Sequence, residues 1–167
     1  MRNKQKGFSL IELLIVVAII LIIAAIAIPN LIRSKMAANE ASAVATLRTL
    51  NTAEVVYSSN YSVATVFAAN LSALGDGGTA ANCAPGAPPP TSANACLIDT
   101  AIEKAISTTV TKSGYYLTYP APGANGYTIN NDPGQPGTSG TRHFFTNQTL
   151  VITQNSTAAA SATDSPI

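Results

Sequence analysis

One uninterrupted apolar run near the start of the chain limits what this sequence can fold into. Between Phe8 and Ile28 only Ser9 and Glu12 are polar. A helix of this length spans about 31 Å at ~1.5 Å per residue, which matches the hydrocarbon thickness of a bilayer. Leucine, isoleucine and valine supply twelve of the last sixteen residues of the run, and alanine supplies the other four. We therefore expect residues 8–28 to form a transmembrane helix.

Glu12 is the one acidic residue inside this run. A carboxylate at the bilayer centre costs about 3 kcal/mol, and less near the interface. The twelve large aliphatic residues contribute roughly −4 to −7 kcal/mol to insertion, so the segment should insert in spite of Glu12. Because acidic residues within spans are usually functional, Glu12 is a candidate functional residue. The alternative is a plain signal anchor that merely tolerates the acid near the interface.

Basic residues flank the run on both sides: Arg2, Lys4 and Lys6 before it, and Arg33 and Lys35 after it. The first group favours a cytoplasmic N-terminus, and the second group weakens that bias. A basic start also fits a secretory signal peptide, with Ala25-Ile26-Ala27 as its small-residue cleavage site. The apolar run is longer than the usual core of such a peptide, and an acid inside it would be unusual.

Composition argues against several other classes of function. The chain has 167 residues, of which 10% are charged, and it has neither a nucleotide-binding GxxxxGK[ST] loop nor a basic stripe. We therefore predict no specific nucleic-acid partner. No acid pair, nucleophile–base pair or metal-ligand cluster is visible, so we predict no catalytic residue, metal site or cofactor. His143 is interpreted as structural or exposed, and the loop at Asp132 has too few oxygen ligands for calcium.

The string KGFSLIE from Lys6 to Glu12, followed by the apolar helix and Pro29, resembles the N-terminus of type IV pilins and type II secretion pseudopilins. It is most similar to type IVa pilins. The resemblance is close from about Lys4 to Tyr61. It implies that residues 1–7 are a leader cut between Gly7 and Phe8 by a prepilin peptidase, and that Phe8 is then N-methylated. Removing the leader leaves six basic residues against eight acidic ones, a side-chain charge of −2.

The resemblance also implies how the subunit would assemble. Glu12 would pair with the Phe8 amine of an adjacent subunit, in a helical filament of identical chains held in lipid before assembly. An inner-membrane platform with an ATPase motor would extract the chain. The precursor would be a single-pass protein of the bacterial inner membrane with its N-terminus in the cytoplasm, and the product an extracellular pilus for adhesion, twitching motility or DNA uptake. The alternatives are a major pseudopilin of a type II secretion system and a membrane-anchored binding module that never polymerises.

Residues 29–61 are expected to form the amphipathic half of the same helix. No glycine or proline occurs from residue 30 to residue 60. Apolar residues recur at helical spacing on one face: Ala43, Leu47, Leu50, Tyr57 and Tyr61. Pro29 lacks an N–H, so it should kink or locally melt the helix, or simply end it. The family resemblance favours unwinding on packing into the filament.

The remainder predicts an α+β, pilin-like fold, in which the long helix packs on a four-stranded antiparallel sheet. Residues 62–114 would form an αβ-loop with short helices at 63–74, ended by Gly75, and at 99–107. Residues 115–155 would form the sheet, one face buried and the other solvated. Residues 156–167 are rich in Ala, Ser and Thr and should be a disordered tail. The expected strands lie at 115–119, 126–130, 142–146 and 150–153, with a turn at 131–134 after the second.

Cys83 and Cys96 are the only cysteines of the chain. Beyond the membrane, where the compartment is oxidising, they should form a disulfide. Their spacing does not match a zinc site. The best-known pilins fasten their C-terminal loop with a disulfide, whereas this bond would close the αβ-loop.

Overall fold

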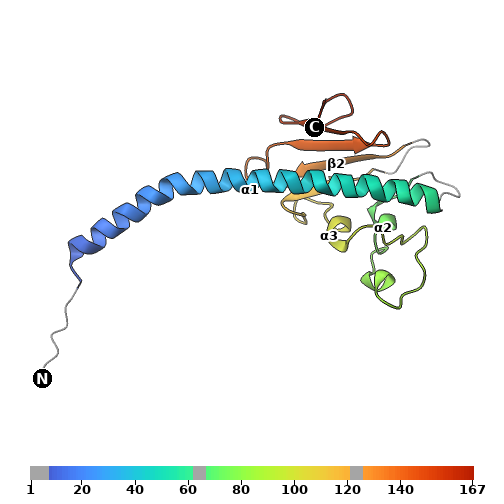
Figure 1. The fold of residues 1–167 in the computed structure, drawn as a ribbon, viewed down its shortest axis with the longest axis horizontal. Helices are drawn as coiled ribbons and strands as arrows, with labels where there is room; N and C mark the ends of the chain where they lie inside the picture. Colours follow the sequence, from blue (N-terminus) through green and yellow to red (C-terminus); the bar gives the residue numbers. More distant parts are fainter. Residues whose placement is uncertain (1–7, 62–66, 121–125) are drawn as a thin grey trace, which may run out of the picture. The chain divides into compact units, whose positions relative to one another are not determined.

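A single long helix, α1 (Leu10–Tyr61), dominates the N-terminal third of the chain (Figure 1). The computed structural model describes residues 8–61, 67–120 and 126–167. Its contacts divide the chain into two units, residues 1–35 and residues 36–167, and each unit is described by itself. The predicted leader and the Gly7 cleavage position lie outside the described residues.

α1 continues without interruption through Pro29. The expectation that the helix might simply end there is therefore wrong. Proline removes only one helical hydrogen bond, the one that would reach the Ala25 carbonyl, and the neighbouring apolar residues keep the helical conformation on both sides. Unwinding at Pro29 in a filament stays a prediction.

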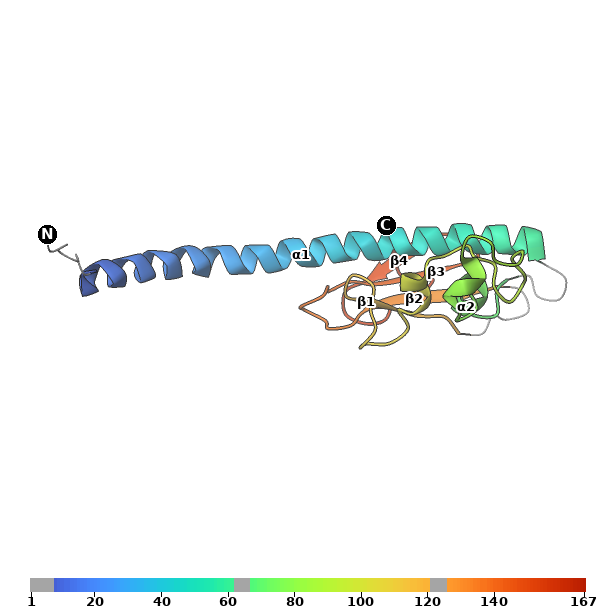
Figure 2. The ribbon, with the colours of Figure 1, turned by 90° about the horizontal axis from the view of Figure 1, so that it is seen from below.

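The second part of α1 buries the face that the apolar spacing indicates. Leu47 and Leu50 are fully enclosed, and the other apolar residues of the stripe, with Ala53 added to it, are buried or packed against the core: Ala43, Ala53, Tyr57 and Tyr61. Figures 1 and 2 show this part of α1 lying along one face of the sheet. The predicted packing of the long helix on the antiparallel sheet is confirmed.

The sheet is antiparallel throughout, and its strands follow one another in chain order. The strands are β1 (Tyr115–Thr118), β2 (Thr128–Pro133), β3 (His143–Asn147), β4 (Ile152–Asn155) and β5 (Ser165–Pro166). The register opposes Leu117 to Asn131, and Asn131 to Phe144. The α+β fold class is confirmed, with five strands where the sequence predicts four.

β2 extends three residues beyond its predicted end, through the residues predicted to form a turn. The prediction fails because polar residues typical of turns find partners in α1 and in the sheet. Asn131 Nδ2 donates to the Ala43 carbonyl at 3.1 Å, and Asp132 Oδ1 lies 2.7 Å from His143 Nδ1. A bend follows at Gly134, whose N–H donates to the Gly114 carbonyl, and the turn lies at residues 137–139.

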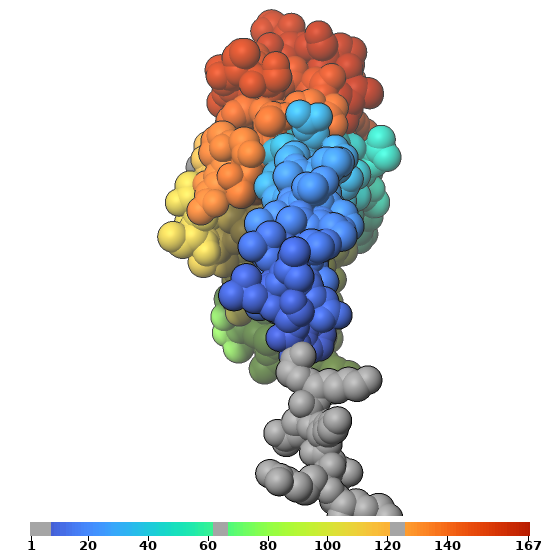
Figure 3. Space-filling model, turned by 90° about the vertical axis from the view of Figure 1, so that its left-hand side faces the viewer, coloured from blue at the N-terminus to red at the C-terminus, as the bar shows by residue number. Residues whose placement is uncertain are grey.

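The prediction that residues 156–167 form a disordered tail is also wrong. Its last residues form β5, which pairs with β4, and Ala160 is 4% exposed. Side chains of the sheet face away from α1 hold the intervening segment, since Asn130 Nδ2 donates to the Ala160 carbonyl at 2.8 Å and Thr153 Oγ1 to the Ser161 carbonyl at 2.6 Å. Figure 3 shows the red C-terminal part of the chain lying against orange residues that precede it in the sequence. The second face of the sheet is therefore covered in part, not wholly solvated.

Along the chain, three short helices of the described residues follow α1 and precede β1: α2 (Leu71–Leu74), η1 (Ala80–Cys83) and α3 (Thr100–Glu103). Asn70 caps α2 and Asp99 caps α3, because each side chain accepts the N–H of the residue three positions later. Gly75 ends α2, as predicted. Both predicted helices are shorter than expected, and residues 63–66 of the first lie outside the described residues.

Candidate functional site: the apolar segment and the polar face of α1

The first unit exposes almost all of its apolar side chains. Phe8 and Leu10 are each 80% exposed, and the large residues that follow are about half exposed or more, as at Val16 (47%) and Ile26 (66%). α1 holds a window long and apolar enough to cross a membrane, and none of that window is buried within the structure. A surface of this kind requires either lipid or other apolar chains around it.

Glu12 lies in the first turn of α1. The helix opens with the Leu13 N–H donating to the Ser9 carbonyl at 3.2 Å. A carboxylate at this end interacts favourably with the helix dipole. Among the residues that the structure describes, none forms a hydrogen bond or ion pair with Glu12, and Phe8 lies four positions before it. Their pairing between subunits stays a prediction.

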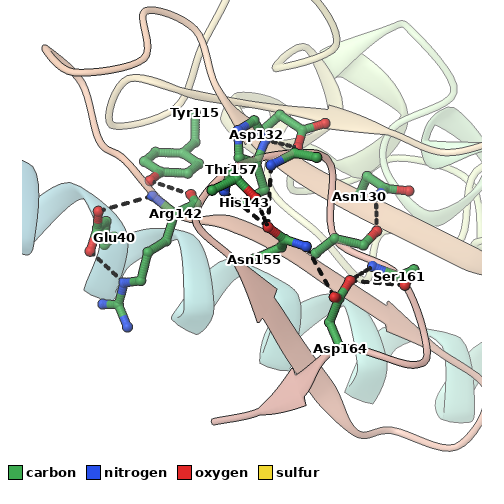
Figure 4. A network of polar contacts seen from close by, with 12 residues as sticks. Glu40, Tyr115, Asn130, Asp132, Arg142, His143, Asn155, Thr157, Ser161 and Asp164 are labelled. Atoms are coloured by element: carbon green, nitrogen blue, oxygen red, sulfur yellow. Dashed lines mark hydrogen bonds and ion pairs between the residues drawn. The ribbon is translucent and has the colours of Figure 1, made fainter.

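The second unit places polar groups on the buried face of α1, which the sequence analysis missed. Glu40 is 7% exposed and receives several donors from the segment before β3 (Figure 4). Arg142 Nε donates to Oε2 at 2.7 Å, and the N–H groups of Thr141 and Arg142 donate to Oε1 at 2.9 and 3.3 Å. Burial alone would raise the pKa of Glu40, but these hydrogen bonds together lower it.

Asn51 joins α1 to three other parts of the domain. Its Oδ1 accepts the hydroxyls of Tyr127 and Thr146, each at 3.0 Å. Its Nδ2 donates to the Leu150 carbonyl at 3.3 Å. The side-chain amide thus fixes the register of the sheet relative to the helix.

Glu54 is the most deeply enclosed of these polar residues, with no exposed side-chain surface. Tyr119 Oη lies 2.6 Å from its Oε1, and the Ala68 N–H donates to Oε2 at 3.1 Å. Burial raises the pKa of Glu54, and the two hydrogen bonds offset that only in part.

The signal for this polar face is present in the sequence but incomplete. Glu54 lies four residues after Leu50 and three before Tyr57, and so falls on the apolar stripe itself. An ionisable residue at such a position indicates a buried hydrogen-bonding partner. The partners come from residues 14 to 102 positions away, which spacing along the helix cannot identify.

The disulfide between Cys83 and Cys96 is present, as predicted. It closes the segment after η1, and the Cys96 N–H donates to the Gly75 carbonyl at 2.9 Å. This hydrogen bond fastens the loop to the end of α2. The disulfide itself lies outside α1 and the sheet.

His143 pairs with Asp132 across β2 and β3 on the face of the sheet that the C-terminal segment covers in part (Figure 4). Both side chains are mostly buried, at 19% and 11% exposed. Within the described ranges, no group of three or more His, Cys, Asp or Glu residues could hold a metal ion. The contact itself is that of a structural pair.

Comparison with known proteins finds a family motif and similarity to pilins of two organisms. Residues 2–28 match the prokaryotic N-terminal methylation motif. The type IV wide pilus major component PilA4 of Thermus thermophilus is 44% identical over 82 residues, which cover 49% of this chain and 62% of that protein. The type IV major pilin protein PilA of Myxococcus xanthus is 51% identical over 51 residues, which cover 30% of this chain and 23% of that protein.

The chain thus spans less than two thirds of the length of either relative. No solved structure matches it significantly. This chain therefore carries the prokaryotic N-terminal methylation motif and is similar to type IV pilins, and its long N-terminal helix packed on an antiparallel sheet supports that family.

Proposed function

We propose that this chain is a structural subunit of a type IV pilus that polymerises through the first part of α1. One observation carries the proposal: the described part of the chain buries none of the apolar span within residues 8–28. Lipid covers them before assembly. On leaving the bilayer they need an equally dry environment, and a bundle of identical helices in a filament core supplies it.

Processing precedes assembly in this proposal. A prepilin peptidase cuts between Gly7 and Phe8, where a residue without Cβ lets the enzyme approach the backbone closely. The new Phe8 amine is then methylated and keeps its positive charge. The methylation motif at residues 2–28 supports this step.

Glu12 then acts as a register device. An unpaired acid in an apolar medium is costly, and the Phe8 amine of an adjacent subunit relieves that cost only when it lies beside the acid. The exposed position of Glu12 in the first turn of α1 leaves its carboxylate accessible to such a partner. A buried ion pair of this kind specifies the fit more than it adds net stability.

Before assembly the chain is a single-pass precursor in the inner membrane with a cytoplasmic N-terminus. An assembly platform and its ATPase motor extract it, because the chain has no phosphate-binding loop of its own. Pro29 is the position where the helix can unwind as the subunits pack, since one hydrogen bond is already missing there. The resulting filament would serve adhesion, twitching motility or DNA uptake.

Mass spectrometry of sheared surface material, paired with electron microscopy, tests the proposal. We expect long filaments that contain this chain and a mature N-terminus at methylated Phe8. Short fibres confined to the periplasm would identify a secretion pseudopilin. A chain that retains residues 1–7 and stays monomeric in cells and in detergent would contradict the proposal, and a start at Ile28 would indicate a cleaved signal peptide.

A further inference from the structure

Glu54 is a carboxyl group enclosed by tyrosines. The titratable groups that face it are Tyr57 from α1, Tyr119 directly after β1, and Tyr127 just before β2. Each of these phenols is neutral at physiological pH, and burial raises the pKa of each one. No cation lies within salt-bridge distance of Glu54 among the described residues. Segments 62–66 and 121–125, outside the described residues, contain no ionisable side chain in their sequences.

Four hydrogen-bonding groups form a closed ring at this site. Tyr119 Oη lies 2.6 Å from Glu54 Oε1 and 2.7 Å from the Ala68 carbonyl oxygen. The Ala68 N–H donates to Glu54 Oε2 at 3.1 Å, which closes the ring. Ala68 itself is fully buried. Among the described residues, both backbone polar groups of Ala68 find their partners in this ring.

The number of protons in the ring determines the state of Glu54. A tyrosine hydroxyl has one proton, and here two oxygen acceptors lie at hydrogen-bonding distance from it. If Glu54 were ionised, the hydroxyl would donate to the carboxylate, and two oxygen atoms without a proton between them would face each other at the Ala68 carbonyl. If Glu54 is protonated, its O–H donates to Tyr119, and Tyr119 donates to Ala68. Every donor and acceptor of the ring is then satisfied.

We infer that Glu54 is an un-ionised carboxylic acid in the folded domain, and that its proton fastens Ala68 to α1 and to the end of β1. Raising the pH removes this proton and opens the contact. The ring thus makes the start of the αβ-loop a pH-sensitive element of the domain. A buried carboxylate without a cation is costly, which agrees with the proton count.

Glu40 provides the contrasting case on the same face of the same helix. Its carboxylate accepts from the Arg142 guanidinium, from the backbone N–H groups of Thr141 and Arg142, and from the Thr141 hydroxyl. An ionised acid suits those partners, and a protonated one does not. Of these two buried glutamates of α1, Glu54 is therefore neutral and Glu40 is ionised. The difference follows from the number of donors around each carboxyl group.

The direction of the pH effect follows from linkage. The folded domain holds the Glu54 proton more tightly than the unfolded chain, so the contribution of this group is greatest below the unfolded pKa of about 4.3. It declines as the pH rises through the raised folded value. Glu54→Gln keeps the ring without a titratable proton, because the amide NH₂ donates to Tyr119 and the amide oxygen accepts from Ala68.

Denaturant unfolding of the full chain in detergent micelles, from about pH 4 to about pH 8, tests the inference. We expect the unfolding midpoints of wild type and Glu54→Gln to agree at the acid end, and the variant midpoint to become the higher one as the pH rises. Glu40→Gln is the matched control, and its unfolding midpoint should fall below that of wild type as the pH rises over the same range. A wild-type advantage over Glu54→Gln that stays constant or grows with pH would overturn the inference.

A second measurement does not depend on the folding of any variant. In the folded wild-type chain with ¹³C-labelled glutamate, NMR follows the side-chain carboxyl carbons as the pH changes. The signal assigned to Glu54 should titrate above the ordinary glutamate range of about 4.3. If it titrates at or below that range, Glu54 is ionised and the inference fails.

Discussion

Arg142 Nε lies 2.7 Å from Glu40 Oε2, and this ion pair connects α1 to the segment that leads into β3. The guanidinium also reaches Gln154 Oε1 at 2.7 Å and stacks over the Phe144 ring at 5.4 Å. One side chain thus links the helix, β3 and β4. Because the Glu40 end of the pair is buried, its loss should affect the whole domain.

Glu40→Gln should lower the free energy of unfolding at neutral pH by about 1–3 kcal/mol, since the new amide NH₂ faces groups that are themselves donors. The stabilisation from Glu40 should be present above the unfolded pKa of about 4.3 and be lost as the pH falls through the lowered folded pKa. Urea unfolding of wild type and variant at neutral and acidic pH measures both effects. Equal stabilities at neutral pH would contradict this account of the pair.

Gly75 makes room for the Glu103 carboxylate. A Cβ at this position would overlap Glu103 Oε2, which accepts the Asp76 N–H at 3.0 Å, while the Gly78 N–H donates to Oε1 at 2.9 Å. Gly75→Ala should therefore cost about 1–3 kcal/mol through loss of these buried hydrogen bonds.

A double-mutant cycle with Glu103→Ala checks this assignment. In the Glu103→Ala background the added methyl meets no carboxylate, so Gly75→Ala should cost much less than in wild type. Additive costs for the two substitutions would show that the glycine is required for some other reason.

The C-terminal segment should contribute to stability, because Ala160 is 4% exposed and its carbonyl accepts Asn130. Ala160→Asp buries an unpaired charge and should lower the free energy of unfolding by about 2 kcal/mol or more. Ala159→Asp is the matched control, since Ala159 is exposed, and should change it by about 0.5 kcal/mol or less. Equal effects in thermal unfolding would mean that this segment does not pack on the sheet.

Replacing both Cys83 and Cys96 by serine should lower the free energy of unfolding by about 3 kcal/mol, because a cross-link across 13 residues restricts the unfolded chain. The backbone bonds from Ala95 and Leu97 to α2 remain in the folded state. The fold should therefore persist without the disulfide. Reducing agent added to wild type should reproduce the loss, and no effect of either treatment would contradict the prediction.

Periodicity predicted the parts of this fold whose signals are local. The apolar run at residues 8–28 and the stripe from Ala43 to Tyr61 predict α1, and short strand segments separated by turn residues predict most of the sheet. The prediction fails where a residue finds its partner far along the chain. Asn131 and Asp132 are typical of turns, yet they continue β2, because Ala43 and His143 bind their side chains.

The same limit applies to the C-terminal segment and to the polar face of α1. Alanine, serine and threonine from residue 156 onward indicate disorder, since such residues bury little apolar surface. Sheet side chains bind the backbone of this segment instead, as Asn130 binds Ala160. The spacing along α1 places Glu40 and Glu54 on the buried face, but only the folded chain distinguishes the acid that meets Arg142 from the acid that meets Tyr119.

Electron microscopy of surface filaments from cells that produce Glu12→Leu in place of wild type tests the central claim most directly. Ser9→Ala is the matched control, because it changes the other polar residue of the apolar run. We predict that Glu12→Leu is inserted and processed to methylated Phe8, as mass spectrometry can verify, yet forms no regular filaments, whereas Ser9→Ala assembles. Filaments of Glu12→Leu as abundant and regular as those of wild type would contradict the account.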